Sequence, residues 1–176
     1  MKFLVLKFLT ITFYLITTVL SYSIEQTDIK NIVINKIPKS YENVVFKDIN
    51  NRDVNLDDFK NQLLILNFWA TWCAPCIEEL PSLDLLQSQK NLNNLKIIPI
   101  NIGQENIEKS KTFFKDLNIK NLNIYHDPTV DLAKKFALRG IPTSIIINKK
   151  GQEFARVLGY LNFNDKNFIT WLEKFN

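Results

Sequence analysis

Two cysteines, Cys73 and Cys76, are the residues of this chain whose type and spacing most clearly imply chemistry. They are the only cysteines among 176 residues, and two residues separate them in the stretch W-C-A-P-C. An apolar run over residues 63–70 predicts a buried strand that leads into a helix beginning at the cysteines. A thiol at a helix N-terminus meets free backbone N–H groups and the positive end of the helix dipole, which favour the thiolate. The pattern predicts a redox-active dithiol.

The expected helix gives the two thiols different roles. Cys73 comes first, and Pro75 is tolerated after it because the N–H that proline lacks has no helical partner in the first turn. Cys76 falls on the same side of the helix, within disulfide reach of Cys73 but one turn deeper. We therefore expect Cys73 to attack the disulfide of a partner protein and Cys76 to resolve the mixed disulfide.

Two other interpretations of the cysteine pair are weaker. A purely structural disulfide between Cys73 and Cys76 would close a very short loop, which removes little entropy from the unfolded chain. A zinc site needs three or four ligands, and His126 is the only histidine and lies far away in the sequence, where it fits the end of a strand. We therefore expect no metal and no cofactor other than the redox-active disulfide itself.

The composition fits one globular domain with an additional N-terminal segment. Hydrophobic residues make up 46% of the chain and charged residues 23%, with only 4 glycines. The formal net charge is +4, and two of the positive charges lie in the first seven residues. Because no basic stripe with interleaved aromatic residues is present, we expect no nucleic-acid partner.

The first 23 residues have the layout of an export signal. Lys2 and Lys7 precede an apolar run over residues 8–20, and the small residues Ser21 and Ser23 follow it. The run is short for a bilayer span, which needs about 20 residues. We expect residues 1–23 to be a signal peptide or a membrane anchor.

The remainder divides into a short connection and one domain. Residues 24–40 mix polar residues with isolated apolar ones and are expected to form a tether, so that the domain covers residues 41–176. Strand and helix patterns alternate along this domain and end in a hairpin and a helix. This order predicts an α/β fold with a mixed central sheet, helices on both faces and an N-terminal β-hairpin. The expected strands are 41–47, 52–56, 63–70, 95–102, 122–125, 143–148 and 153–159, and the expected helices are 73–90, 106–117, 129–138 and 165–175.

The stretch N-F-W-A-T-W-C-A-P-C, followed later by G-I-P-T-S, resembles the thioredoxin superfamily and within it the exported TlpA/ResA-type branch of thiol–disulfide oxidoreductases. The resemblance covers residues 41–176 and implies a thioredoxin-like fold. Pro81 matches a proline that kinks the active-site helix of the family. Pro142 matches the cis-proline of a loop that lies against the cysteines and offers backbone groups to the substrate. The residues implied to contact the substrate are Trp72, Ile141, Pro142 and Thr143.

One position departs from the cytosolic thioredoxins. Their strand before the cysteines carries a buried aspartate, whereas this chain has Asn67, which cannot accept a proton. The resemblance places an acidic residue at Glu79, three positions after Cys76 and therefore on the same side of the helix. We expect Glu79 to act as the base for the resolving thiol. The alternative for Glu79 is a solvated side chain beside Glu78. For Asn67, either a role in hydrogen bonding near the thiols or no role beyond the strand is open.

The resemblance implies a reductase in the bacterial periplasm, either soluble or tethered to the inner membrane. Such proteins pass electrons from a membrane thiol donor to cysteine pairs of exported proteins, commonly during cytochrome c maturation or assembly of the copper site of cytochrome oxidase. A disulfide oxidase or isomerase is the main alternative, although related oxidases carry a histidine where this chain has Ala74 and Pro75. A copper-binding assembly factor would space its cysteines more widely, and a peroxidase would carry a lone cysteine.

Overall fold

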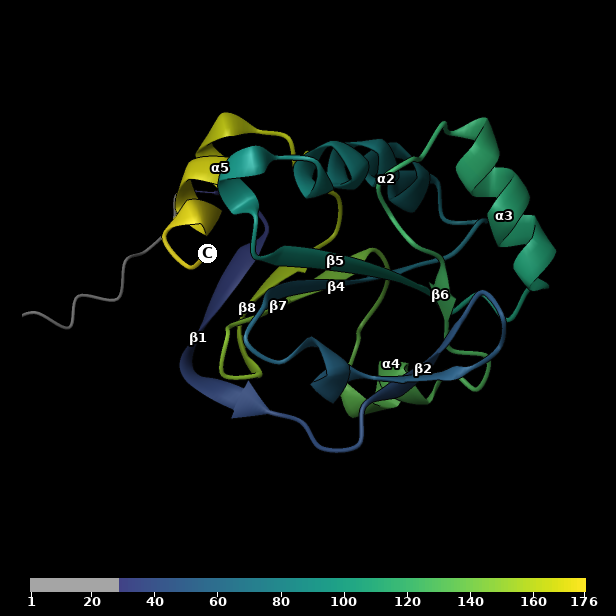
Figure 1. Cartoon of the computed structure of the whole chain (residues 1–176), viewed down its shortest axis with the longest axis horizontal. Helices are drawn as coiled ribbons and strands as arrows, with labels where there is room; N and C mark the ends of the chain where they lie inside the picture. The colour runs from purple at the N-terminus through teal and green to yellow at the C-terminus, as the bar shows by residue number, and fades with distance from the viewer. Residues whose placement is uncertain (1–28) are drawn as a thin grey trace, which may run out of the picture.

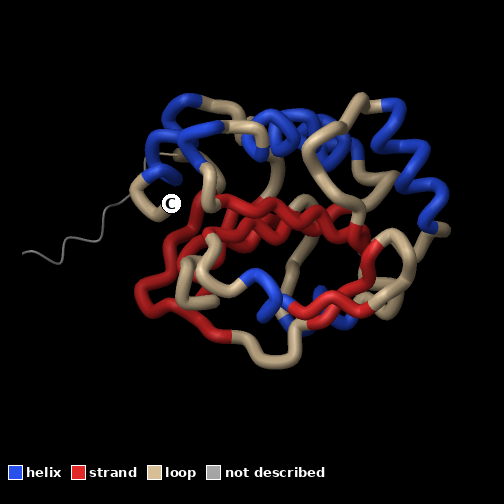
Figure 2. Tube along the Cα trace, viewed as in Figure 1, coloured by secondary structure: helices blue, strands red, loops and turns tan. Residues whose placement is uncertain are grey.

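The computed structural model describes residues 29–176 (Figure 1). Within them, eight strands form one mixed sheet in the order β1-β8-β7-β4-β5-β6-β2-β3, and Figure 2 shows helices above and below it. The strands are β1 (Ile32–Ser40), β2 (Val45–Asp48), β3 (Asp53–Asn55), β4 (Leu63–Trp69), β5 (Leu95–Asn101), β6 (Tyr125–His126), β7 (Thr143–Ile147) and β8 (Gln152–Leu158). The helices are α2 (Ala74–Gln87), α3 (Ile107–Asp116), α4 (Asp131–Lys135) and α5 (Lys166–Glu173), with short 3-10 turns η1 (Leu56–Phe59) and η2 (Lys90–Leu92).

Strand β4 lies at the centre of the sheet, parallel to β5 and antiparallel to β7. All of its residues are buried, as expected for a continuous apolar run covered on both faces. Alternate side chains of β4 enter two separate cores: Ile65 packs in the core under α2, α3 and α5, whereas Leu66 packs in the core over α4. Asn67 follows Leu66 and therefore points to the α2 side.

The predicted fold class is confirmed, including the hairpin formed by β2 and β3. The hairpin is not the first element, however, because β1 precedes it. Residues 32–40 were expected to belong to a tether, but they form β1 and pair with β8, so the folded domain begins before Tyr41. The expected signal or anchor over residues 1–23 lies outside the described residues.

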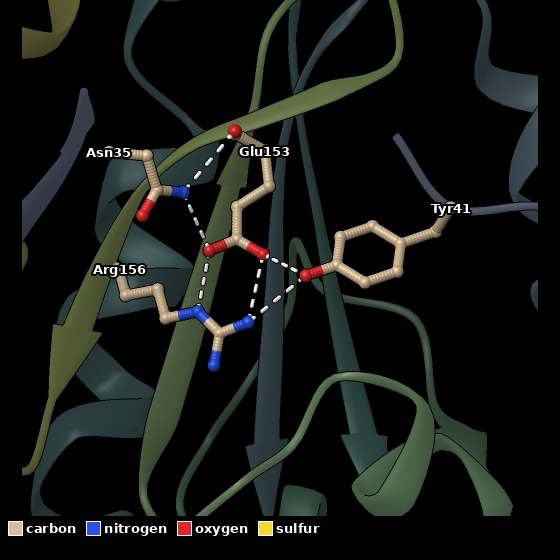
Figure 3. Close-up of polar contacts among 4 residues, drawn as sticks. All are labelled: Asn35, Tyr41, Glu153 and Arg156. Atoms are coloured by element: carbon tan, nitrogen blue, oxygen red, sulfur yellow. Dashed lines mark hydrogen bonds and ion pairs between the residues drawn. The ribbon is translucent and has the colours of Figure 1, made fainter. Parts of the chain in front are cut away.

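Strand β1 escapes a sequence pattern because it is an edge strand with few buried side chains. Ile32 and Ile34 pack against the core, while most of its later residues are exposed. Its pairing with β8 shifts register between Ile34 and Lys39. Polar contacts hold this irregular part: Asn35 of β1 and Tyr41 just after it both donate hydrogen bonds to the carboxylate of Glu153 on β8 (Figure 3).

Two other elements are shorter than predicted. Helix α4 covers only Asp131–Lys135 instead of 129–138, because Val130 has a left-handed backbone with φ of 59°. The Asp127 carboxylate accepts a hydrogen bond from the N–H of Leu132 at 2.8 Å and so satisfies the start of this helix. Strand β6 was expected over 122–125 but consists of Tyr125 and His126.

In residues 29–176, no helix combines the length and apolar character needed to cross a bilayer.

Candidate redox active site

The cysteine pair lies where the sheet passes into α2. Cys73 is the N-cap of α2, Cys76 is in its first turn, and the two form a disulfide with their Cα atoms 5.3 Å apart. Cys73 is 6% exposed and Cys76 is fully buried, whereas the side chain of Trp72 is largely exposed. A partner can therefore reach only the Cys73 side of the disulfide, next to the Trp72 ring.

The segment that leads into the cysteines is anchored to α3 and to the loop before it. The Trp69 ring packs against Phe113 and Phe114 of α3. Thr71 donates a hydrogen bond to the carboxylate of Glu105, which lies in the loop between β5 and α3. These contacts fix the backbone two residues before Cys73. The role of Glu105 was not predicted, because its only signal is its place after the end of a buried strand.

The loop before β7 reaches the same edge of the sheet. The Ile141–Pro142 peptide bond is cis, as the resemblance implied. Thr143 follows it and pairs with Phe68 of β4, next to the end of the strand that leads to the cysteines. The carbonyl of Pro142 accepts a hydrogen bond from the N–H of Gly159 at 2.9 Å. The structure thus brings Ile141, Pro142 and Thr143 to the end of the sheet that carries Trp72 and the disulfide.

Glu79 is buried, with 1% of its surface exposed, so the alternative of a solvated side chain is excluded. Its neighbour Glu78 is exposed. One carboxylate oxygen of Glu79 accepts a hydrogen bond from Asn67 Nδ2 at 2.6 Å, and the other accepts one from the N–H of Leu161 at 3.4 Å. Burial raises the pKa of Glu79 to about 8, although both hydrogen bonds oppose the rise. This carboxyl group can therefore exchange a proton near neutral pH.

Asn67 is fully buried and joins three elements of the fold. Besides Glu79 of α2, its Nδ2 also donates to the hydroxyl of Ser144 on β7, at 3.0 Å. The alternative of an Asn67 with no role beyond the strand is therefore wrong. The parts played by Ser144 and Leu161 were not predicted. The signal for Ser144 is the β4–β7 register, which pairs Asn67 with Ser144, and the sequence alone does not provide that register.

His126 does not join this site. It lies half-buried on β6, where it pairs with Lys47 of β2, and burial lowers its pKa. Among residues 29–176, no three side chains of histidine, cysteine, aspartate or glutamate gather in a way that could hold a metal ion. The groups of the described site that can exchange electrons or protons include the thiol pair and the buried carboxyl group of Glu79.

Comparison with known proteins agrees with this chemistry. The sequence profile described as the AhpC/TSA family matches residues 35–152. The thiol-disulfide oxidoreductase ResA of Bacillus thuringiensis subsp. konkukian is 30% identical over 124 residues, which are 70% of this chain and 70% of that protein.

Two solved structures have the same fold. The crystal structure of StoA from Bacillus subtilis aligns with a TM-score of 0.60 and 25% identity, over 75% of this chain and 94% of that one. A thiol:disulfide interchange protein of the thioredoxin family from Chlorobium tepidum aligns with a TM-score of 0.65 and 22% identity, over 79% of this chain and 98% of that one. The chain belongs to the AhpC/TSA family, and it is a thiol–disulfide oxidoreductase of the TlpA/ResA type within the thioredoxin superfamily.

Proposed function

We propose that this oxidoreductase is an exported reductase that transfers electrons to cysteine pairs of other exported proteins. The observation that carries the proposal is the buried carboxyl group of Glu79, which lies three residues after Cys76 and has a pKa of about 8. Reduction of a target requires the deeper thiol of Cys76 to lose its proton. A base with a pKa near neutrality suits that step.

In the proposed reaction, the Cys73 thiolate attacks one sulfur of the target disulfide. A mixed disulfide forms, and the other target sulfur leaves as a thiolate. Cys76 then passes its proton to the Glu79 carboxylate and attacks the sulfur of Cys73, which releases the second target sulfur as a thiolate. The target gains two electrons, its thiolates take up one proton from Glu79 and one from solvent, and the chain is left with the Cys73–Cys76 disulfide.

The surroundings of Cys73 support a protein as the substrate. The exposed Trp72 ring offers an apolar contact, and the loop of Ile141, Pro142 and Thr143 lies at the same edge of the sheet. We propose that an extended segment of the target, with its cysteine, lies between these two features. Only the side of Cys73 is open to it, which gives the order of attack described above.

The cellular setting is also a proposal. The layout of residues 1–23 favours export to the bacterial periplasm, in soluble form or tethered to the inner membrane. A membrane thiol protein would then return two electrons to the disulfide after each cycle. Suitable targets are the haem-ligating cysteines of apocytochrome c or the copper-site cysteines of cytochrome oxidase.

The reduction potential tests this direction of electron flow. The full chain is equilibrated in dithiol and glutathione buffers of known potential, and the oxidised fraction is followed by tryptophan fluorescence. We expect a value near about −270 mV, typical of reductases. A value near about −120 mV would identify an oxidase or isomerase and contradict the proposal. The double variant Cys73→Ser/Cys76→Ser is the control and should show no transition.

A further inference from the structure

The side-chain amide of Asn67 is satisfied at one end only. Its Nδ2 donates to Glu79 Oε1 at 2.6 Å and to Ser144 Oγ at 3.0 Å. Its Oδ1 is buried and has no hydrogen-bond partner in the described part of the chain. A buried acceptor without a partner is uncommon in folded proteins and costs stability. The unpaired oxygen therefore needs an explanation beyond packing.

A second buried asparagine provides an internal comparison. Asn101 lies at the end of β5, and its Nδ2 also donates to a glutamate and a serine: to Glu105 at 3.0 Å and to Ser110 at 2.8 Å. Its Oδ1, however, accepts a hydrogen bond from the N–H of Gly103 at 2.6 Å. The orientation of Asn101 is thus fixed by contacts at both ends. That of Asn67 is fixed at one end.

The partner of Asn67 changes its hydrogen-bonding capacity when it exchanges a proton. A carboxylate only accepts hydrogen bonds, whereas a protonated carboxyl group also donates one. With a pKa of about 8, Glu79 populates both states near neutral pH. On α2, its neighbour Glu78 is exposed, and Cys73 and Cys76 form the disulfide. The pKa of Glu79 is raised by burial and lowered by the hydrogen bonds from Asn67 and the Leu161 N–H, and no charged side chain of residues 29–176 is among these causes.

We infer that Asn67 is a positioning residue for Glu79, and that its amide turns by half a rotation as Glu79 gains or loses its proton. The two ends of an amide have nearly equal size, so the turn exchanges Nδ2 and Oδ1 without changing the shape of the core. In one orientation Nδ2 donates a hydrogen bond to the carboxylate, and in the other Oδ1 accepts one from the protonated acid. The Ser144 hydroxyl can donate or accept and therefore fits both orientations.

This inference rests on the proposed function, in which Glu79 takes up and releases a proton. Its test does not require catalysis. The titration of Glu79 is followed by carboxyl ¹³C NMR on the full chain in its disulfide form, and Glu79→Gln assigns the signal. Asn67→Leu removes the hydrogen bond between Asn67 and Glu79 in both protonation states of Glu79. The bond to the charged carboxylate is about twice as strong as the bond to the neutral acid, so its loss disfavours the charged form. We expect the midpoint to move to higher pH by about one unit.

Asn101→Leu is the matched control, because it removes the same kinds of contact, to a glutamate and to a serine, at another place in the fold. It should leave the midpoint of Glu79 near pH 8. An unchanged midpoint in Asn67→Leu would show that Asn67 only fills space. A reduction potential near the oxidising end would contradict the proposed function and leave this midpoint unaffected, so the two failures are distinguishable.

The contact between Asn67 and the titrating carboxyl group should also be visible in the wild-type protein. In the wild-type protein, the side-chain NH₂ signals of Asn67 should shift between about pH 6 and about pH 10 with the midpoint of Glu79. Those of Asn101 should stay constant, and the shift of Asn67 should vanish in Glu79→Gln. Signals of Asn67 that stay constant across this range would overturn the proposed rotation.

Discussion

Glu79 and Glu153 are both buried, with 1% and 0% of their surfaces exposed, yet their pKa values shift in opposite directions. Burial raises the pKa of Glu79 to about 8. At Glu153 burial also favours the neutral acid, but hydrogen bonds from Arg156, Tyr41 and Asn35 and the charge of Arg156 outweigh it and lower the pKa. Burial alone therefore does not decide whether a glutamate holds a charge.

The difference lies in the number and charge of the donors. The Glu153 carboxylate accepts hydrogen bonds from Arg156 through two nitrogens, from Tyr41 at 2.5 Å and from Asn35 at 2.9 Å (Figure 3). Glu79 accepts one short bond from the neutral amide of Asn67 and one of 3.4 Å from a backbone N–H. These donors thus favour the charged form of Glu153, which fastens β1 to β8. Glu79 is left able to exchange its proton.

Removal of the Arg156 cation should produce the largest loss in the free energy of unfolding. Arg156→Met leaves the Glu153 anion buried without its charged partner, which costs about 3–5 kcal/mol in the free energy of unfolding. Urea denaturation near neutral pH measures this loss. The double variant Glu153→Gln/Arg156→Met should recover part of it, because no buried charge remains. A loss below about 1 kcal/mol for Arg156→Met would mean that the pair behaves like an exposed salt bridge.

The pH dependence of stability should distinguish the two glutamates next. The pKa of Glu79 rises from its ordinary 4.5 to about 8 on folding, so the folded chain binds this proton more tightly. The contribution of this proton to the free energy of unfolding is fully present below pH 4.5. It is lost as the pH rises to about 8, by about 1.4 kcal/mol per pH unit. Glu153 behaves in the opposite way: its pKa is lowered, so its contribution is present above 4.5 and is lost as the pH falls.

We therefore expect Glu79→Gln to remove the decline in stability between about pH 5 and about pH 8. Urea denaturation of the disulfide form at several pH values measures it, because no thiol titrates in that form. Glu78→Gln, an exposed neighbour, is the control and should follow the wild type. Parallel profiles for the wild type and Glu79→Gln would show that Glu79 titrates as an ordinary surface glutamate.

The two glutamates also differ in how far the sequence could predict them. Glu79 is three residues from a recognisable cysteine, so helical spacing and the family resemblance together placed it at the site. Glu153 depends on Tyr41, 112 positions away in the sequence, and on Asn35, 118 positions away. No local pattern contains such pairs. A charged residue at this place in a strand ordinarily indicates a solvated face.

The same distinction holds for the strands. The continuous apolar run of β4 predicted a central strand correctly, because both faces of such a strand must be covered. Strand β1 was missed because it contributes only a few side chains to the core, and its polar residues owe their place to partners on β8. On β8, Glu153 lies beside the register shift between β7 and β8, a feature that no sequence pattern indicates. Edge strands fixed by distant polar contacts are therefore the least predictable part of this fold.

The smallest expected effect comes from the Tyr41 hydroxyl. Tyr41→Phe keeps the ring that packs against Phe136, with centroids 4.5 Å apart. It removes the hydrogen bond that the hydroxyl donates to Glu153 and the one of 3.1 Å that it accepts from Arg156. Because Arg156 and Asn35 still bind the carboxylate, we expect a loss of about 1 kcal/mol in the free energy of unfolding. Tyr160→Phe, a change in an exposed tyrosine, is the matched control and should stay within about 0.5 kcal/mol of the wild type. Equal stabilities of the two variants would show that Arg156 and Asn35 alone suffice to hold the buried anion.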